Sequence, residues 1–130
     1  MNKEKYYKIL FIVAALYNII NSVTFILVSI VATDLFPLFG VEIPPSMIWL
    51  QLSLILIALF GVGYIMVSRD ISKNHGLVLI GGLAKLSFFL LTMIYFLLGD
   101  VNILIVLLGG VDLIMVILFI EFLIFQSKNE

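Results

Sequence analysis

Four long apolar runs, separated by short polar or proline-containing segments, account for most of the chain. Each run holds about 20 residues or more, enough to cross ~30 Å of hydrocarbon as an α-helix. The runs predict helices over residues 9–33, 46–67, 76–98 and 103–125. They are continuous, whereas strands of a membrane β-barrel alternate apolar and polar positions. We therefore expect an all-α integral membrane protein, an antiparallel four-helix transmembrane bundle forming one domain over residues 1–130.

The connection at residues 34–45 is the longest one. Pro37, Gly40, Pro44 and Pro45 forbid a continuous helix through it, yet its other residues are unusually apolar for a loop. Two placements fit this composition. The segment lies in the membrane interface, or it folds back over the mouth of the bundle as a lid.

Positive charge is unequally shared between the two sides of the predicted bundle. With four spans, the N-terminal flank, the polar turn at residues 68–75 and the C-terminal tail share one side. These segments contain Lys3, Lys5, Lys8, Arg69, Lys73 and Lys128. The loops of the other side contain no Lys or Arg, so the positive-inside rule predicts a multi-pass protein of the plasma or inner cell membrane with both termini cytoplasmic.

Composition supports the membrane assignment and narrows the function. Hydrophobic residues make up 64% and charged residues 12% of the chain, against roughly 45–50% and about 25% in soluble domains. The absence of cysteine excludes disulfide and thiol redox chemistry. A single histidine, His75, excludes a haem held by two histidines and argues against zinc. We predict no metal site, and no basic patch suggests a nucleic-acid partner.

The last two predicted helices carry Lys85, Asp112 and Glu121. Charges at membrane depth are costly and usually mark functional sites. Measured from the helix ends nearest the termini, Glu121 lies ~6 Å, Lys85 ~12 Å and Asp112 ~20 Å deep. Because side chains lean toward the N-terminus of their own helix, Lys85 leans toward the termini and both acids lean away from them. This favours an ion pair of Lys85 with Glu121 over one with Asp112, unless the register of the hairpin is shifted by about one turn. Asp112 and Glu121, nine residues apart, fall on opposite faces of their helix.

Asp112 then needs other polar partners. The first helix carries a stripe of small and polar residues that includes Asn18 and Asn21, and Gln51 lies at a similar depth in the second. We expect a polar pocket of Asp112, Gln51 and the two asparagines, with Lys85 below it. The candidate ligand-binding or proton-relay residues are Asp112, Lys85, Gln51, Asn18, Asn21, Glu121 and Tyr64.

Each candidate also has a purely structural interpretation. Lys85 can extend to the interface, Glu121 can lie among lipid headgroups, and a neutral Asp112 can bond neighbouring helices. The asparagines can likewise serve helix packing. Close helix contact is expected at two glycine pairs: Gly61 with Gly63, and Gly81 with Gly82.

The chain resembles small bacterial and archaeal four-helix membrane proteins of the broad DoxX-like kind at Gly61-Val62-Gly63-Tyr64, Arg69-Asp70, Gly81-Gly82-Leu83-Ala84-Lys85 and Asp112, with Trp49 and Gln51 leading in. The resemblance covers the second to fourth helices and implies a four-helix antiparallel bundle. Some DoxX-like members resemble subunits of quinone-linked oxidoreductase systems. This implies a lipophilic ligand, such as a quinone or lipid, or a partner protein. Thiol-linked roles of that group require cysteines, which are absent here.

Three functions follow from these observations. The first is a non-enzymatic subunit that binds a lipophile or another small ligand, or that serves as an accessory subunit. Its expected partners are membrane lipids and either further copies of itself in a homo-oligomer or the other subunits of a larger membrane complex. The alternative is a proton-coupled transporter or an oligomeric channel. An enzyme is the least favoured, because no nucleophile and base pair supports it, and we predict no catalytic residue.

Overall fold

The computed structural model describes residues 2–129; Met1 and Glu130, the ends of the predicted flank and tail, lie outside this range. The elements, in chain order, are α1 (Lys3–Val31), the 3-10 helix η1 (Thr33–Phe39), α2 (Ile48–Arg69), α3 (His75–Leu97) and α4 (Ile103–Lys128). The predicted all-α four-helix architecture is confirmed. All four α-helices are long and apolar enough to cross a membrane.

The helix ends follow local capping more than hydropathy. α1 begins at Lys3, six residues before the predicted start at residue 9, because the side chain of Asn2 accepts a hydrogen bond from the N–H of Glu4 at 2.8 Å. α2 begins at Ile48, two residues after the predicted start at residue 46, with Met47 as its N-cap. Polar residues thus extend α1 by six residues at its start (9 − 3) and α4 by three at its end (128 − 125).

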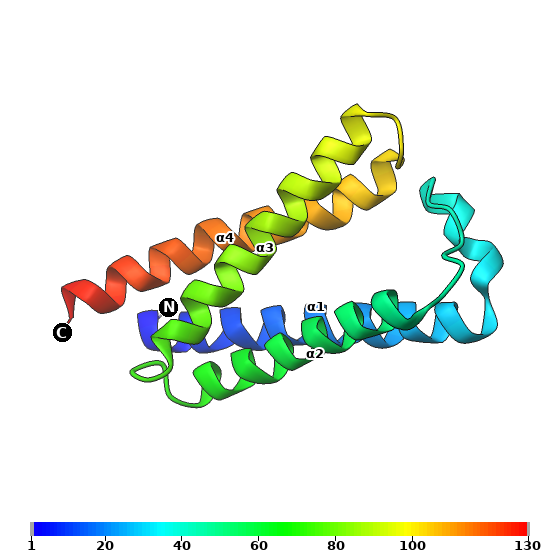
Figure 1. The fold of residues 1–130 in the computed structure, drawn as a ribbon. Helices are drawn as coiled ribbons and strands as arrows, with labels where there is room; N and C mark the ends of the chain where they lie inside the picture. Colours follow the sequence, from blue (N-terminus) through cyan, green and yellow to red (C-terminus); the bar gives the residue numbers. More distant parts are fainter. Residues whose placement is uncertain (1, 130) are drawn as a thin grey trace.

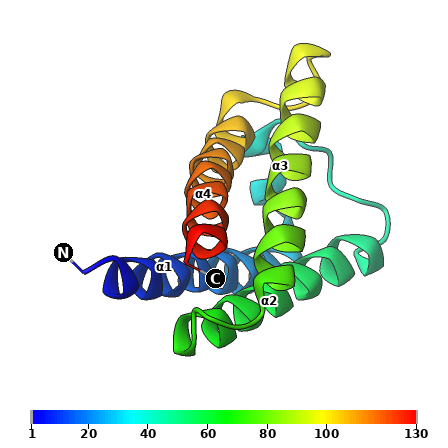
Figure 2. The ribbon, with the colours of Figure 1, turned by 90° about the vertical axis from the view of Figure 1, so that its left-hand side faces the viewer.

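The four helices form two antiparallel hairpins, α1 with α2 and α3 with α4 (Figure 1). Both ends of the chain and the α2–α3 turn lie together, at what we call the terminal end (Figure 1). η1 and the α3–α4 turn lie at the opposite, distal end. From their shared turn, α2 and α3 diverge in both views (Figures 1 and 2). The hairpins therefore meet at the terminal end and separate toward the distal end.

Large aromatic side chains fill the space between the hairpins at the terminal end. This aromatic cluster comprises Tyr7, Phe11, Tyr64, Phe119 and Phe122, each at most 1% exposed. The ring centroids of Phe11 and Phe122 are 4.8 Å apart, and those of Tyr64 and Phe119 are 5.2 Å apart. Such edge-on contacts add to the stabilisation from the large apolar area that each ring buries. They hold together two hairpins that otherwise diverge.

Two of the four predicted glycines mark close contacts. A Cβ atom on Gly61 would lie 2.7 Å from the Cγ1 of Ile19, so this glycine lets α1 and α2 approach closely. Gly81 faces the ring of Tyr64, which leaves no room for a side chain on α3. The prediction is wrong for Gly63 and Gly82. A Cβ atom on Gly63 would lie 3.5 Å from the Cδ1 of Leu77, and one on Gly82 would lie 3.8 Å from the Cδ2 of Phe119, which are ordinary van der Waals distances.

The turn between α2 and α3 is closed by side-chain hydrogen bonds. The N–H of Ser72 donates to Asp70 Oδ1 at 3.0 Å, and the hydroxyl of Ser72 donates to the same oxygen at 2.5 Å. Both bonds favour the carboxylate and lower the pKa of Asp70 below its ordinary value of 3.8. Asn74 then starts α3 from a left-handed conformation, with φ of 66°.

The 34–45 connection folds back toward the bundle, the second of the two predicted placements. η1 contains Pro37 and ends at Gly40, whose φ of 75° reverses the chain. The backbone N–H of Asn102 donates to the carbonyl of Phe39 at 3.0 Å, and its side-chain amide donates to the carbonyl of Leu38. These bonds fasten the connection to the α3–α4 turn at the distal end.

Candidate functional site

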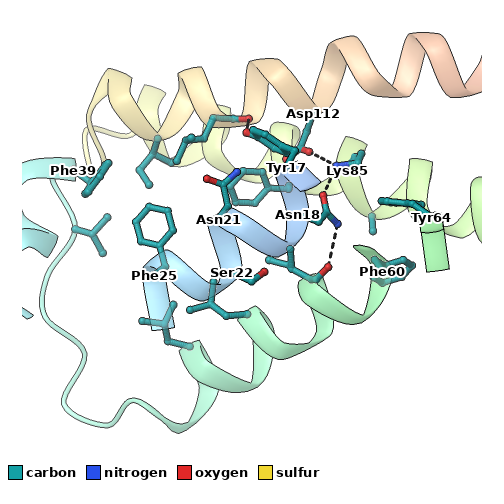
Figure 3. A pocket seen from close by; sticks show the side chains of 18 of the residues that line it. Tyr17, Asn18, Asn21, Ser22, Phe25, Phe39, Phe60, Tyr64, Lys85 and Asp112 are labelled. Atoms are coloured by element: carbon teal, nitrogen blue, oxygen red, sulfur yellow. Dashed lines mark hydrogen bonds and ion pairs between the residues drawn. The ribbon is translucent and has the colours of Figure 1, made fainter. Parts of the chain in front are cut away.

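A buried ion pair lies midway along the α3–α4 hairpin. Lys85 Nζ is 2.6 Å from Asp112 Oδ1, and the two side chains are only 5% and 11% exposed. The same ammonium group donates a hydrogen bond to Asn18 Oδ1 at 2.8 Å (Figure 3). One lysine therefore connects α3, α4 and α1.

The predicted pairing of Lys85 with Glu121 is wrong, as is the alternative in which Lys85 extends to the interface. Glu121 accepts a hydrogen bond from the hydroxyl of Tyr7 at 2.9 Å, and its carboxylate lies 4.0 Å from Lys3 Nζ. Its side chain is 47% exposed. Asp112 and Glu121 thus contact different residues, as their opposite faces on α4 predicted.

The error came from treating the terminal ends of α3 and α4 as level. Measured instead from their shared turn, Lys85 lies 12 residues before Leu97 (97 − 85) and Asp112 lies 9 after Ile103 (112 − 103). The offset is then about 3 residues, or ~4.5 Å along the helix axes. A flexible lysine side chain spans that distance, so the ion pair forms.

A cavity of about 230 Å³ lies beside the ion pair, between the two hairpins (Figure 3). All four helices and the η1 connection contribute to it. Its polar lining comprises Tyr17, Asn18, Asn21, Ser22, Tyr64, Lys85 and Asp112. Its apolar lining includes Phe25, Phe36, Phe39, Val41, Leu50, Leu54, Ile57, Phe60, Ala84, Phe88, Ile105 and Leu108. The cavity thus combines mainly apolar walls with one polar region.

α1 supplies most of the polar wall. Asn18 accepts from Lys85 and donates through its side-chain amide to the carbonyl of Ile57 at 3.1 Å. Asn21 and Ser22, one turn further, also line the cavity. The predicted small, polar stripe of α1 therefore faces protein, and its middle turn faces the cavity.

Two tyrosine rings flank the lysine. Lys85 Nζ lies 5.4 Å from the ring centroid of Tyr17 and 5.6 Å from that of Tyr64, within the range of cation–π attraction. The hydroxyl of Tyr17 donates to the carbonyl of Leu108 at 2.8 Å, which connects α1 to α4. Tyr64 was a predicted site residue and Tyr17 was missed. Its spacing of four residues from Asn21 places both on one helix face, and this signal could have found it.

Gln51 does not belong to the cavity, contrary to prediction. Its side-chain amide donates to the hydroxyl of Ser29 on α1 at 3.0 Å. The α2 residues that do line the cavity recur at helical spacing: Leu50, Leu54, Ile57, Phe60 and Tyr64. Gln51 lies about 100° around the helix from Leu50, so it faces α1 and not the cavity.

No group of three or more His, Cys, Asp or Glu side chains within residues 2–129 is arranged to hold a metal. No family model, curated protein or solved structure matches the chain. The resemblance to DoxX-like proteins therefore stays a prediction. The site's own chemistry is a fixed polar region against apolar walls, which is the usual composition of small-molecule pockets.

Proposed function

We propose that this chain is a multi-pass membrane protein that binds a small lipophile, or the end of a larger one, beside Lys85 and Asp112. The 230 Å³ cavity carries this proposal, because it combines apolar walls with a polar region held by a buried ion pair. One water needs only about 10–15 Å³ of such space, so the cavity has room for a ligand of several non-hydrogen atoms. The protein then acts as a binding or accessory subunit, without chemistry of its own.

The route to the cavity favours a ligand that comes from the bilayer. α2 and α3 face each other at the terminal end, where the ring of Tyr64 lies against Gly81. Beyond that point the helices diverge (Figures 1 and 2). Both Leu54 of α2 and Phe88 of α3 line the cavity. We infer that a lipophile passes between the distal halves of these two helices.

The same proposal gives the protein an orientation. The terminal end carries all six basic residues other than Lys85, so we propose that it faces the cytoplasm. The cavity then lies in the outer half of the plasma or inner cell membrane.

Photolabelling in lipid nanodiscs tests the proposal. An alkyl diazirine probe is incorporated, activated and mapped by peptide mass spectrometry. We expect labels on cavity residues of α1 and α2, and we expect Leu54→Trp to remove them by filling the cavity. Leu56→Trp is the matched control, since Leu56 is 50% exposed on the outside of α2. Labels confined to the outer helix faces would contradict the proposal.

A second candidate is proton-coupled transport. The observation that favours it is an ionisable pair buried midway through the hairpin and bordering a cavity. Transport also requires a route past the aromatic cluster, and therefore a second conformation. Flux measurements separate the two candidates.

A further inference from the structure

The hydroxyl of Ser22 lies on the cavity wall and is fully buried. Within residues 2–129, Ser22 Oγ is the one buried side-chain oxygen or nitrogen that has no hydrogen-bond partner. Buried polar groups are nearly always hydrogen-bonded, so such an exception requires an explanation.

Other helical hydroxyls in this chain solve the same problem locally. Each of the following donates to a backbone carbonyl three or four residues earlier: Ser29, Ser53, Ser68, Ser87 and Thr92. That arrangement is the usual one for serine and threonine inside helices. Ser22 stands apart from them on the wall of the cavity (Figure 3). Ser22 lines the cavity without such a bond, so in the ligand-free structure its hydroxyl keeps an unused donor and acceptor.

The charge of the site limits what that group is. Lys85 and Asp112 neutralise each other at 2.6 Å, and the remaining polar lining consists of amides and hydroxyls. A carboxylate or ammonium head group would bring a net charge into this neutral, buried site, at a large desolvation cost. An uncharged head group carries no such cost.

We propose that the cavity takes an uncharged lipophile whose head group carries a hydroxyl or carbonyl oxygen, which hydrogen-bonds to the Ser22 hydroxyl beside Asn21. A hydroxyl both donates and accepts, so Ser22 serves either head group. The apolar part of the ligand lies among Phe25, Phe39 and Leu54 on the other walls. This inference rests on the proposed function and specifies the class of ligand.

A matched set of probes tests it: one alkyl diazirine chain that ends in a hydroxyl, a carboxylate, an amine or a methyl group. Each probe labels the protein in nanodiscs, and labels on cavity peptides are quantified after correction for partition into the lipid. We expect the alcohol to label the cavity about tenfold more than either charged probe. We expect Ser22→Ala to lower labelling by the alcohol about tenfold, as for one lost buried hydrogen bond, and to leave the methyl-ended probe unchanged.

The methyl-ended probe shows that the Ser22→Ala cavity remains intact. Ser53→Ala is the control substitution, because Ser53 lies on the exposed face of α2 with its hydroxyl bonded to the carbonyl of Trp49. Equal or stronger labelling by a charged probe, or alcohol labelling unchanged in Ser22→Ala, would overturn the inference and leave the proposed function intact. A cavity that no probe labels would overturn both.

Discussion

At the scale of single residues, the ion pair of Lys85 and Asp112 constrains the structure more than its size suggests. Each partner alone is a charge in an apolar environment, and the pair is tolerated because the two charges neutralise each other with an amide from Asn18 beside them. Removing one partner should therefore cost far more than removing both. We predict that Lys85→Met or Asp112→Leu lowers the free energy of unfolding by about 3–5 kcal/mol, and that the double variant recovers most of the loss.

Equilibrium unfolding in detergent, arranged as a double-mutant cycle, measures this coupling. Lys3→Met is the control, because Lys3 and Glu121 are 4.0 Å apart with side chains 62% and 47% exposed. Such exposed pairs contribute less than about 1 kcal/mol. Additive single costs would show that the two charges do not depend on each other.

Ser22 should behave in the opposite way to an ordinary buried polar residue. Without a ligand, its hydroxyl is desolvated and unbonded, so Ser22→Ala should raise the free energy of unfolding of ligand-free protein by about 1 kcal/mol. Ser53→Ala should change it by less than about 0.5 kcal/mol. Denaturation of delipidated protein tests this, and destabilisation by Ser22→Ala would indicate a hydrogen bond in the ligand-free state.

The sequence was informative about which polar residues line the cavity and less so about which of them contact each other. Lys85, Asp112, Asn18, Asn21 and Tyr64 were all recognised, because charge, amide or aromatic character stands out in an apolar helix. Their pairing depends on the register of the α3–α4 hairpin, which is fixed by its short turn and not by helix ends. The missing partner of Ser22 depends on atomic positions and leaves no trace in the sequence.

At the scale of the elements, the tight α1–α2 hairpin depends on Gly61. Its α-carbon is so close to α1 that an added Cβ would lie 2.7 Å from Ile19 Cγ1 and 3.1 Å from the carbonyl oxygen of Ala15. We predict that Gly61→Ala lowers the free energy of unfolding by about 1–3 kcal/mol, as overpacking usually does. A side chain at this position forces the two helices apart.

Gly110→Ala provides the matched control in α4, because a Cβ there would meet nothing within 4 Å. Alanine is the better helix former, so this variant should be neutral or more stable by up to about 1 kcal/mol. Unfolding in detergent compares the two variants directly. Equal effects would mean that helix propensity, and not contact with α1, decides the outcome.

The helices were the most predictable feature of the structure. Apolar runs of this length leave the backbone no alternative to helix in a bilayer, so all four helices were expected. Their ends were less certain, because a cap such as Asn2 acts on one turn only. η1 was expected only as a non-helical lid or interfacial segment, since Pro37 and the apolar residues around it do not determine a 3-10 helix.

At the scale of the whole molecule, the two hairpins differ in how they meet at each end. The aromatic cluster fills the terminal end, whereas η1 and Asn102 close the distal end with hydrogen bonds over a cavity. No single helix encodes this difference, because it arises from the angle between the hairpins. Helix order and the divergence of the two hairpins therefore came from the structure alone, whereas the polar wall at Asp112, Asn18 and Asn21 was expected from the sequence.

This difference in packing predicts the outcome of a transport assay. Rings at most 1% exposed fill the terminal end, so a proton that reaches Asp112 through the cavity meets tightly packed aromatic side chains beyond it. The assay imposes a pH gradient on proteoliposomes and reads proton flux with an internal pH-sensitive dye. We expect the flux to be no larger than that of protein-free vesicles. We also expect the Asp112→Asn variant to give the same flux as the unsubstituted protein. An added ionophore verifies that the gradient and dye respond. Flux above the vesicle background that disappears in Asp112→Asn would instead make the ion pair a proton relay, and would require a second conformation in which the aromatic cluster opens.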